Sequence, residues 1–154
     1  MHVQPYLYFE GRTEEALEFY KTTLGANIDV MMRMKEAPPE AQAPGDNCRD
    51  DGSASTSGHG GKDNSEKIMH AQFRVGDTVV MASDGMCSGS ADFKGFALTL
   101  TVADDAEAKQ KFDLLAAGGI VQMPLSATFF ATSFGMVRDR FGVVWVVIAA
   151  LPME

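Results

Sequence analysis

Hydrophobic positions at the start of the chain recur first at strand spacing and then at helix spacing. Residues 5–9 are rich in aromatic side chains, which is typical of a short strand. Apolar side chains return at steps of three and four over residues 13–24, which predicts an amphipathic helix with Thr13 as its cap and Gly25 at its end. Residues 26–34 then alternate as a strand does, so the chain opens with a strand, a helix and a strand.

The alternation within the strands also indicates which side chains share a face. The strand over residues 26–34 carries Ile28, Val30 and Met32 on one side. A further strand over residues 68–75 has one apolar face, and its other face carries His70, Gln72 and Arg74. A tight turn then leads into a strand over residues 78–83, so the first half of the chain reads βαβββ.

The same order of elements begins again in the second half of the chain. Residues 95–101 predict a strand, and residues 104–117 predict a helix that opens with carboxylates and is followed by a pair of glycines. Three more strands are predicted over residues 120–125, 134–138 and 143–149. The second half therefore also reads βαβββ.

The two halves align as an internal repeat. Setting Ala16 on Ala108 matches Tyr20 with Phe112, and one added residue brings the two helix-ending glycines together. We expect a single domain over residues 1–154, with module one at residues 1–84 and module two at residues 93–154. The first module alone carries an insertion, the loop at residues 35–66.

The inserted loop has no apolar periodicity and is longer than the connections of most compact domains. Its composition is compatible with a cover, an arm or a disordered segment. Four of its side chains are metal-ligand types whose spacing matches no short zinc pattern: Cys48, Asp50, Asp51 and His59. A solvent-exposed loop is the better interpretation. The motif at residues 58–61 is no phosphate loop, because neither a strand before it nor a helix after it is predicted.

Composition narrows the classes of function. The 154 residues include 13 Lys and Arg against 21 Asp and Glu, a net charge of −8 that disfavours nucleic acid as a partner. No apolar run is long enough to cross a bilayer and no signal peptide is recognisable, so we expect no membrane association and a cytoplasmic location. The two cysteines show no CxxC spacing.

Several short motifs, in this order and spacing, resemble the PhnB-like proteins of the glyoxalase/bleomycin resistance/dioxygenase superfamily. They are Pro5-Tyr6 with Phe9 and Gly11, Phe19-Tyr20 with Leu24-Gly25, Met69-His70-Ala71, residues 81–84, Phe129-Phe130, Phe134-Gly135, and residues 139–142 before Trp145. The resemblance implies the vicinal oxygen chelate fold, an α+β architecture in which two βαβββ modules form curled mixed sheets around a cleft. It indicates the fold more specifically than any activity.

The resemblance also implies where a metal would bind. In this superfamily a metal commonly sits on four side chains, one from each outer strand of the two modules. The corresponding positions here are Pro5, Met81, Ala97 and Val146. None of these is a good ligand for a divalent metal, and their neighbours supply no set of histidines and carboxylates. We therefore expect no metal centre of this kind.

The remaining candidate is a ligand pocket. His70 is the candidate catalytic residue, as a general base or to orient a bound carbonyl; alternatively it is a histidine of the cleft wall or a subunit interface without chemistry. The alternation of side chains along the first strand predicts that Tyr6 and Tyr8 point toward the helix. The expected pocket residues are Leu7, Phe9, His70, Gln72, Met81, Ser83, Thr99, Phe129, Phe130 and Val146.

These observations leave three hypotheses about function. The first is a homodimeric protein that binds a small apolar or aromatic molecule without a metal, as the bleomycin-sequestering relatives imply. The second is a metal-dependent lyase, isomerase or dioxygenase that uses His70 with a residue of the loop or of a partner chain. The third is methyl transfer, a label common among PhnB-like proteins. No glycine-rich strand-to-helix turn suited to a nucleotide-bearing methyl donor supports it.

Overall fold

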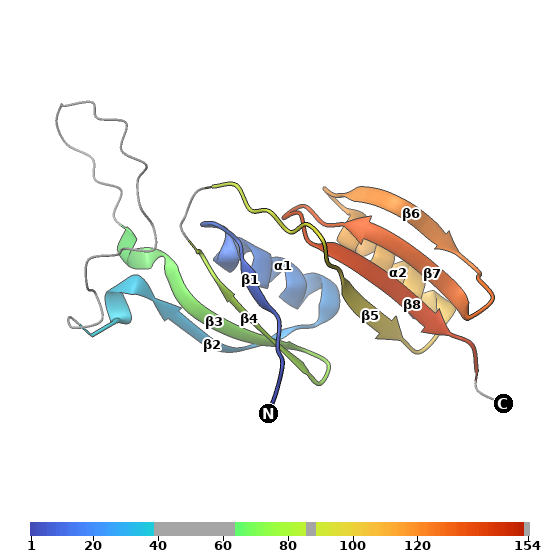
Figure 1. Cartoon of the computed structure of the whole chain (residues 1–154), viewed down its shortest axis with the longest axis horizontal. Helices are drawn as coiled ribbons and strands as arrows, with labels where there is room; N and C mark the ends of the chain where they lie inside the picture. Colours follow the sequence, from blue (N-terminus) through green and yellow to red (C-terminus); the bar gives the residue numbers. More distant parts are fainter. Residues whose placement is uncertain (39–63, 86–88, 153–154) are drawn as a thin grey trace. The chain divides into compact units, whose positions relative to one another are not determined.

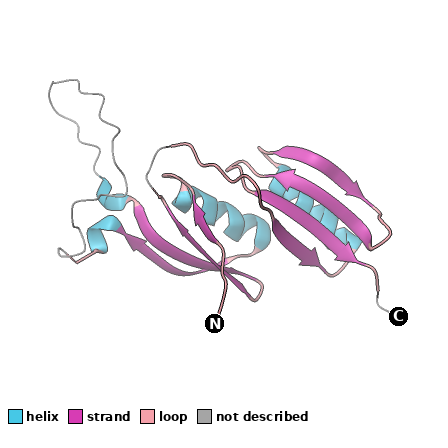
Figure 2. Ribbon diagram, viewed as in Figure 1, coloured by secondary structure: helices cyan, strands magenta, loops and turns pink. Residues whose placement is uncertain are grey.

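The computed structural model describes residues 1–38, 64–85 and 89–152, which fall into two compact units, Met1–Ala91 and Asp92–Glu154. Each unit contains a four-stranded sheet with a helix across one of its faces (Figures 1 and 2). The expected α+β class with two βαβββ modules is confirmed.

The described residues of unit 1 form four strands, one α-helix and two single-turn 3-10 helices. They are β1 (Tyr6–Tyr8), α1 (Thr13–Leu24), β2 (Asn27–Arg33), η1 (Met34–Glu36), η3 (Asn64–Glu66), β3 (Ile68–Val75) and β4 (Thr78–Ser83). The strand order in the sheet is β1-β4-β3-β2, and β1 runs parallel to β4 while the other pairs are antiparallel.

Unit 2 repeats this arrangement. Its elements are β5 (Leu98–Val102), α2 (Asp105–Ala116), β6 (Ile120–Ser126), β7 (Ala131–Arg138) and β8 (Val144–Ala150). The order β5-β8-β7-β6 again places the first strand parallel to the last, which confirms the internal repeat. Over the part of the chain that the structure describes, neither helix is long and apolar enough to span a membrane.

The core of unit 1 lies between α1 and the sheet. The ring of Tyr20 stacks on Phe73 of β3 with a centroid distance of 5.8 Å and an interplanar angle of 16°. Phe9, directly after β1, contacts the same tyrosine at 6.1 Å. All three side chains are almost completely buried. The face of the sheet that carries Phe73 is therefore the face that α1 covers.

A carboxylate that follows the last strand of unit 1 accepts a backbone hydrogen bond at the start of α1. Asp84, buried directly after β4, accepts the backbone N–H of Thr13 at 2.9 Å and that of Ile68 at 2.7 Å. The prediction that the Thr13 hydroxyl caps the helix was wrong. Arg12 occupies the cap position, but its side chain donates to Glu15 and makes no capping hydrogen bond. The Thr13 hydroxyl is buried without a hydrogen-bond partner among the described residues.

The expected face pattern of β2 was also wrong. Ile28 pairs with Phe73 and therefore faces α1, whereas Val30 pairs with Gln72 and faces the other way. The register shifts between Ile28 and Val30, a β-bulge that a count of alternating residues does not detect. Val30 and Met32 consequently extend the sheet face opposite α1.

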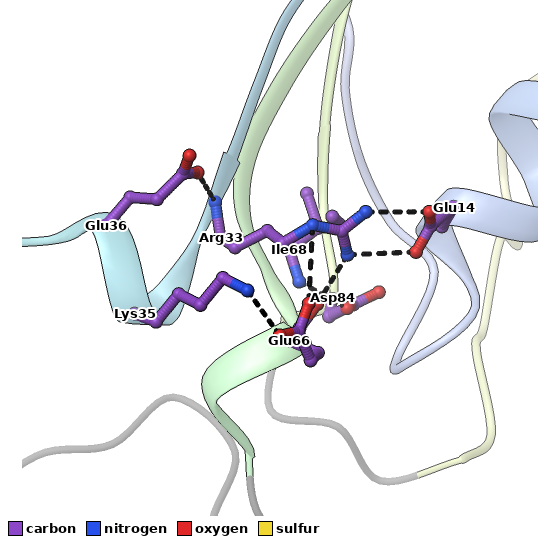
Figure 3. Close-up of polar contacts among 7 residues, drawn as sticks. All are labelled: Glu14, Arg33, Lys35, Glu36, Glu66, Ile68 and Asp84. Atoms are coloured by element: carbon purple, nitrogen blue, oxygen red, sulfur yellow. Dashed lines mark hydrogen bonds and ion pairs between the residues drawn. The ribbon is translucent and has the colours of Figure 1, made fainter.

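A network of ion pairs joins the end of β2 to α1 and η3 (Figure 3). The Arg33 guanidinium donates to both carboxylate oxygens of Glu14, at 2.9 and 2.7 Å, and to the backbone carbonyl of Glu66 at 2.8 Å. Lys35 of η1 forms an ion pair with the Glu66 carboxylate. The Glu36 carboxylate accepts the backbone N–H of Arg33 at 2.6 Å. This network holds together the two ends of the inserted loop.

Candidate functional site

The sheet of unit 1 has a second face that α1 does not cover. Side chains paired in register share a face, and Tyr6 pairs with Met81, which pairs with Gln72. The neighbouring set of Leu7, Ala82 and Ala71 points the other way, toward α1. We call the surface opposite α1 the helix-free face of unit 1; it is formed by Tyr6, Tyr8, His70, Gln72, Met81 and Ser83.

Two expected pocket residues do not lie on this face. Leu7 and Phe9 are buried on the α1 side, with 2% and 1% of their surfaces exposed. Their assignment to the pocket was wrong, and so was the prediction that Tyr6 and Tyr8 point toward the helix. These tyrosines are 36% and 53% exposed and are the site residues that sequence reasoning missed. The residue types of this strand carried a signal for the correct face. A tyrosine hydroxyl can stay hydrated at a surface, whereas leucine and phenylalanine have no polar group that favours exposure.

Tyr6 and His70 are brought together by the pairing of β1, β4 and β3. The phenol oxygen of Tyr6 lies 3.0 Å from Nδ1 of His70, and the ring centroids are 5.7 Å apart. Tyr6 also stacks on Tyr8, with centroids 5.1 Å apart and an interplanar angle of 30°. Three rings from two non-adjacent strands therefore form one continuous aromatic surface.

Burial raises the pKa of the Tyr6 phenol, and this effect exceeds a smaller lowering by a hydrogen bond from the Ser83 hydroxyl. The phenol is therefore protonated at neutral pH and can donate a hydrogen bond. Ser83 lies on the same face as Tyr8, its partner in the β1–β4 register, and its hydroxyl oxygen accepts the backbone N–H of Gly85 at 3.1 Å.

Two further predicted residues, Gln72 and Met81, together with Met32, surround the rings with uncharged groups. Gln72 and Met81 pair with each other across β3 and β4 and are half-buried. Met32 of β2 pairs with His70 and is partly exposed at the sheet edge. The site thus combines aromatic rings, thioethers and a few hydrogen-bonding groups, a composition typical of surfaces that bind small organic molecules.

Of the predicted pocket residues of unit 2, Thr99 and Val146 lie on the corresponding face of its own sheet, and Phe129 and Phe130 lie in the connection before β7. Thr99 pairs with Val146, opposite the side that packs on α2. The ring of Phe130 contacts Phe134 at 5.3 Å and Phe129 at 5.0 Å, both edge to face. Phe129 is almost fully exposed, at 93% of its surface. Unit 2 therefore also presents aromatic rings on the face that its helix leaves uncovered.

The positions at which the superfamily would hold a metal do not fit one. Met81 pairs with Tyr6, not with Pro5, whose backbone carbonyl instead accepts the N–H of Met81 at 3.0 Å. Val146 pairs with Thr99, and Ala97 lies just before β5. Neither the expected residues nor these register partners offer an imidazole or a carboxylate.

The inserted loop also contains side chains of metal-ligand types. Within the ranges 1–38, 64–85 and 89–152, no three His, Cys, Asp or Glu side chains gather as a metal site. The loop residues Cys48, Asp50, Asp51 and His59 lie outside the described residues.

Comparison with known proteins gives a consistent result. The family model for 3-demethylubiquinone-9 3-methyltransferase matches residues 50–148. Protein YjdN of Escherichia coli K12 is 38% identical over 147 residues, which cover 96% of this chain and 94% of that protein.

Solved structures show the same likeness. Protein PA1353 of Pseudomonas aeruginosa is 36% identical with a TM-score of 0.75, over 97% of this chain and 98% of that one. A PhnB protein from Bacillus cereus is 24% identical with a TM-score of 0.71, over 97% and 100% of the two chains. A glyoxylase/bleomycin resistance protein/dioxygenase domain from Frankia, 16% identical, shares the fold with a TM-score of 0.59 over 97% and 95%.

Proposed function

The chain belongs to the 3-demethylubiquinone-9 3-methyltransferase family, a PhnB-like group with the glyoxalase/bleomycin resistance/dioxygenase fold, and on this basis we propose that it binds a small aromatic molecule without a metal ion. The binding surface in this proposal is the helix-free face of unit 1.

One observation carries the proposal: two tyrosines remain exposed and stacked beside a histidine on a sheet face without a helix. Tyr6 and Tyr8 offer ring surfaces on which a planar ligand can stack, and such ring pairs gain about 0.5–1.5 kcal/mol beyond simple burial. Both side chains lose little conformational entropy on binding, because few of their bonds rotate. The same face has hydrogen-bonding groups in His70 and Gln72 to orient a bound molecule.

Charge on this face favours an uncharged ligand. In the described part of unit 1, Arg74 is the charged residue on β3 that shares the parity of His70 and Gln72. Its guanidinium already forms a two-point ion pair with Asp29, at 2.8 and 3.0 Å. A strongly anionic ligand would therefore have to compete with a carboxylate that is already in place.

Metal-dependent catalysis, the second hypothesis, would need ligands other than those of the superfamily. His70 is the only imidazole on the helix-free face within the described residues, and its Nδ1 is already engaged by Tyr6. Metal content measured by mass spectrometry, after purification without chelators, tests this directly. We expect less than about 0.1 equivalent per chain, and about one equivalent of zinc, iron, nickel or manganese would contradict the metal-free proposal.

Methyl transfer, the activity that the family description names, requires a nucleotide-bearing methyl donor whose usual cradle is not found here. The two strand-to-helix connections, at residues 9–12 and 103–104, together contain a single glycine. Backbone N–H groups at the helix starts already donate to carboxylates of this chain, to Asp84 at α1 and to Asp104 at α2. These residues do not fit such a group, and we expect calorimetry to detect no binding of S-adenosylmethionine.

The binding proposal is tested by an NMR titration of the ¹⁵N-labelled protein with 2-acetylnaphthalene. We expect amide shift changes concentrated in β1, β3 and β4 and a substantial loss of affinity in Tyr8→Ala. Phe130→Ala is the matched control, because it removes an exposed ring from unit 2. Binding that depends on Phe130 and not on Tyr8 would move the site to unit 2, and no binding at all would argue against the proposal.

A cytoplasmic homodimer is part of the same proposal. The strand β6 lies at the edge of its sheet and exposes three apolar side chains: Ile120 at 62%, Val121 at 44% and Met123 at 43%. Exposed apolar edges of this kind favour association with a second copy. Sedimentation velocity at micromolar concentration is expected to show a dimer, and Val121→Lys is expected to shift it to monomer. A wild-type monomer would contradict the expectation.

A further inference from the structure

We propose that His70 presents a fixed Nε2–H donor to the carbonyl oxygen of a planar, conjugated carbonyl compound that stacks on the tyrosines of the helix-free face of unit 1. This inference rests on the proposed function and names the class of ligand. It also chooses between the two chemical roles considered for His70, because a ring whose Nε2 carries the proton orients a carbonyl and does not act there as a base.

The direction of the hydrogen bond between Tyr6 and His70 decides the tautomer of the imidazole. The phenol oxygen of Tyr6 lies 3.0 Å from Nδ1 of His70, so a single proton lies between these two atoms. A phenol O–H is a good donor, and an unprotonated imidazole nitrogen is a stronger acceptor than a phenol oxygen. The favoured arrangement therefore has Tyr6 as the donor.

The Tyr6 phenol has one proton to donate, and Nδ1 of His70 is the ring nitrogen that faces it. Burial keeps that phenol protonated, because it raises the pKa of Tyr6. Nδ1 is therefore the acceptor.

A neutral imidazole has a single proton, and the occupied Nδ1 leaves Nε2 as its position. The Tyr6 phenol thus selects the tautomer of His70 without a carboxylate. In this tautomer the imidazole donates from Nε2, which suits a neutral acceptor such as a carbonyl oxygen.

The residues around the His70 imidazole favour a particular shape and charge in the rest of the ligand. Tyr6 and Tyr8 stack at 5.1 Å beside the imidazole, so a flat conjugated body is favoured next to the donor. Met32, paired with His70 on β2, adds an apolar edge. A carboxylate ligand is disfavoured, because Arg74 on the same face of β3 is already paired with Asp29.

The tautomer can be measured without any ligand. Two-bond ¹H–¹⁵N correlation spectra of the imidazoles, recorded at about pH 8.5, distinguish the protonated ring nitrogen from the unprotonated one. The chain has three histidines, so the His70 signals are assigned by their loss in His70→Phe. We expect a proton on Nε2 in the wild type and in Tyr8→Phe, and a mixture of tautomers in Tyr6→Phe. A proton on Nδ1 in the wild type would overturn the inference.

The ligand class is tested with an isosteric pair of probes. 2-Acetylnaphthalene and 2-isopropenylnaphthalene have the same ring and nearly the same shape, but only the first has a carbonyl oxygen. We expect the wild type to bind the acetyl compound about fivefold more tightly, the worth of one neutral hydrogen bond, and His70→Phe to bind both equally.

Failure of the inference and failure of the proposed function give different results. If both probes bind the wild type with equal affinity through the tyrosines, the donor assignment is wrong and the proposed function stands. If a difference between the probes persists in His70→Phe, the donor is another group and the inference is overturned. If neither probe binds, the proposed function fails, and the assigned ligand class fails with it.

Discussion

The indole N–H of Trp145 donates a hydrogen bond of 2.9 Å to the Asp139 carboxylate, and both side chains are buried. The other oxygen of the same carboxylate accepts the backbone N–H groups of Phe141 at 2.8 Å and Val143 at 3.1 Å. One aspartate thus closes the turn between β7 and β8 and anchors the single tryptophan of the chain. A buried carboxylate with three donors is a point at which unit 2 is sensitive to substitution.

Replacing Asp139 with alanine should destabilise the protein strongly. Three buried donors would lose their acceptor, and we expect the free energy of unfolding in urea to fall by about 3 kcal/mol. Trp145→Phe removes one of these bonds and keeps a large ring, so its loss should be smaller, about 1–2 kcal/mol. Equal losses for the two variants would show that the ring, and not the carboxylate, is the main stabilising element.

Asp84 has the corresponding role in unit 1, where it joins the starts of α1 and β3. In Asp84→Ala we expect faster hydrogen exchange at the amides of Thr13 and Ile68, because their acceptor is removed. Asp84→Asn retains one acceptor oxygen and should protect only one of the two amides. Unchanged exchange at both amides in the alanine variant would refute the assigned role.

Gly119, which follows α2, should tolerate substitution less well than a glycine that is required only for its backbone angle. A Cβ on Gly119 would lie 2.2 Å from the backbone oxygen of Arg138, so the backbone must move. We expect Gly119→Ala to destabilise by about 2–3 kcal/mol in thermal or urea unfolding. Gly25, with φ of +67° and open space around its Cβ position, is the control, and alanine there should destabilise by about 1 kcal/mol.

The Glu14–Arg33 pair should contribute to stability in a pH-dependent way. The hydrogen bond from Arg33 lowers the pKa of Glu14, an effect opposed by burial and reinforced by the positive charge. A lowered folded-state pKa adds stability above the unfolded-state pKa, and this stability is lost as the pH falls through the folded-state value.

The difference in urea midpoint between wild type and Glu14→Gln should therefore be largest near neutral pH and shrink toward about pH 3. The side chain of Glu14 is 54% exposed, so the effect should be small and should decrease with added salt. A midpoint difference that grows on acidification would contradict the assignment.

The internal repeat could be predicted from the sequence because each module needs one amphipathic helix and clearly alternating strands. β3 shows this best: Ala71 and Phe73 are buried toward α1, and His70 and Gln72 lie on the opposite face. The contrast between apolar and polar neighbours in this strand is large enough to fix its orientation.

β1 has no such contrast, and its face was predicted incorrectly. Tyr6, Leu7, Tyr8 and Phe9 are all hydrophobic or aromatic, so alternation alone does not tell which pair is buried. The contact between Tyr6 and His70 spans 64 residues and depends on the parallel register of β1 with β4. A single sequence carries no direct signal for that register, nor for the bulge that turns Val30 away from α1.

The network around Arg33 has a consequence for how this chain can change in length. The backbone N–H of Met34 donates to the carbonyl of Lys67 at 2.9 Å. Lys35 pairs with Glu66 (Figure 3), so the two ends of the insertion are fastened to each other. The free energy of closing a loop varies only slowly with its length. Evolution can therefore lengthen or shorten the sequence between these anchors at little thermodynamic cost, and a short glycine-serine linker in place of residues 39–63 should leave the sheet of unit 1 intact.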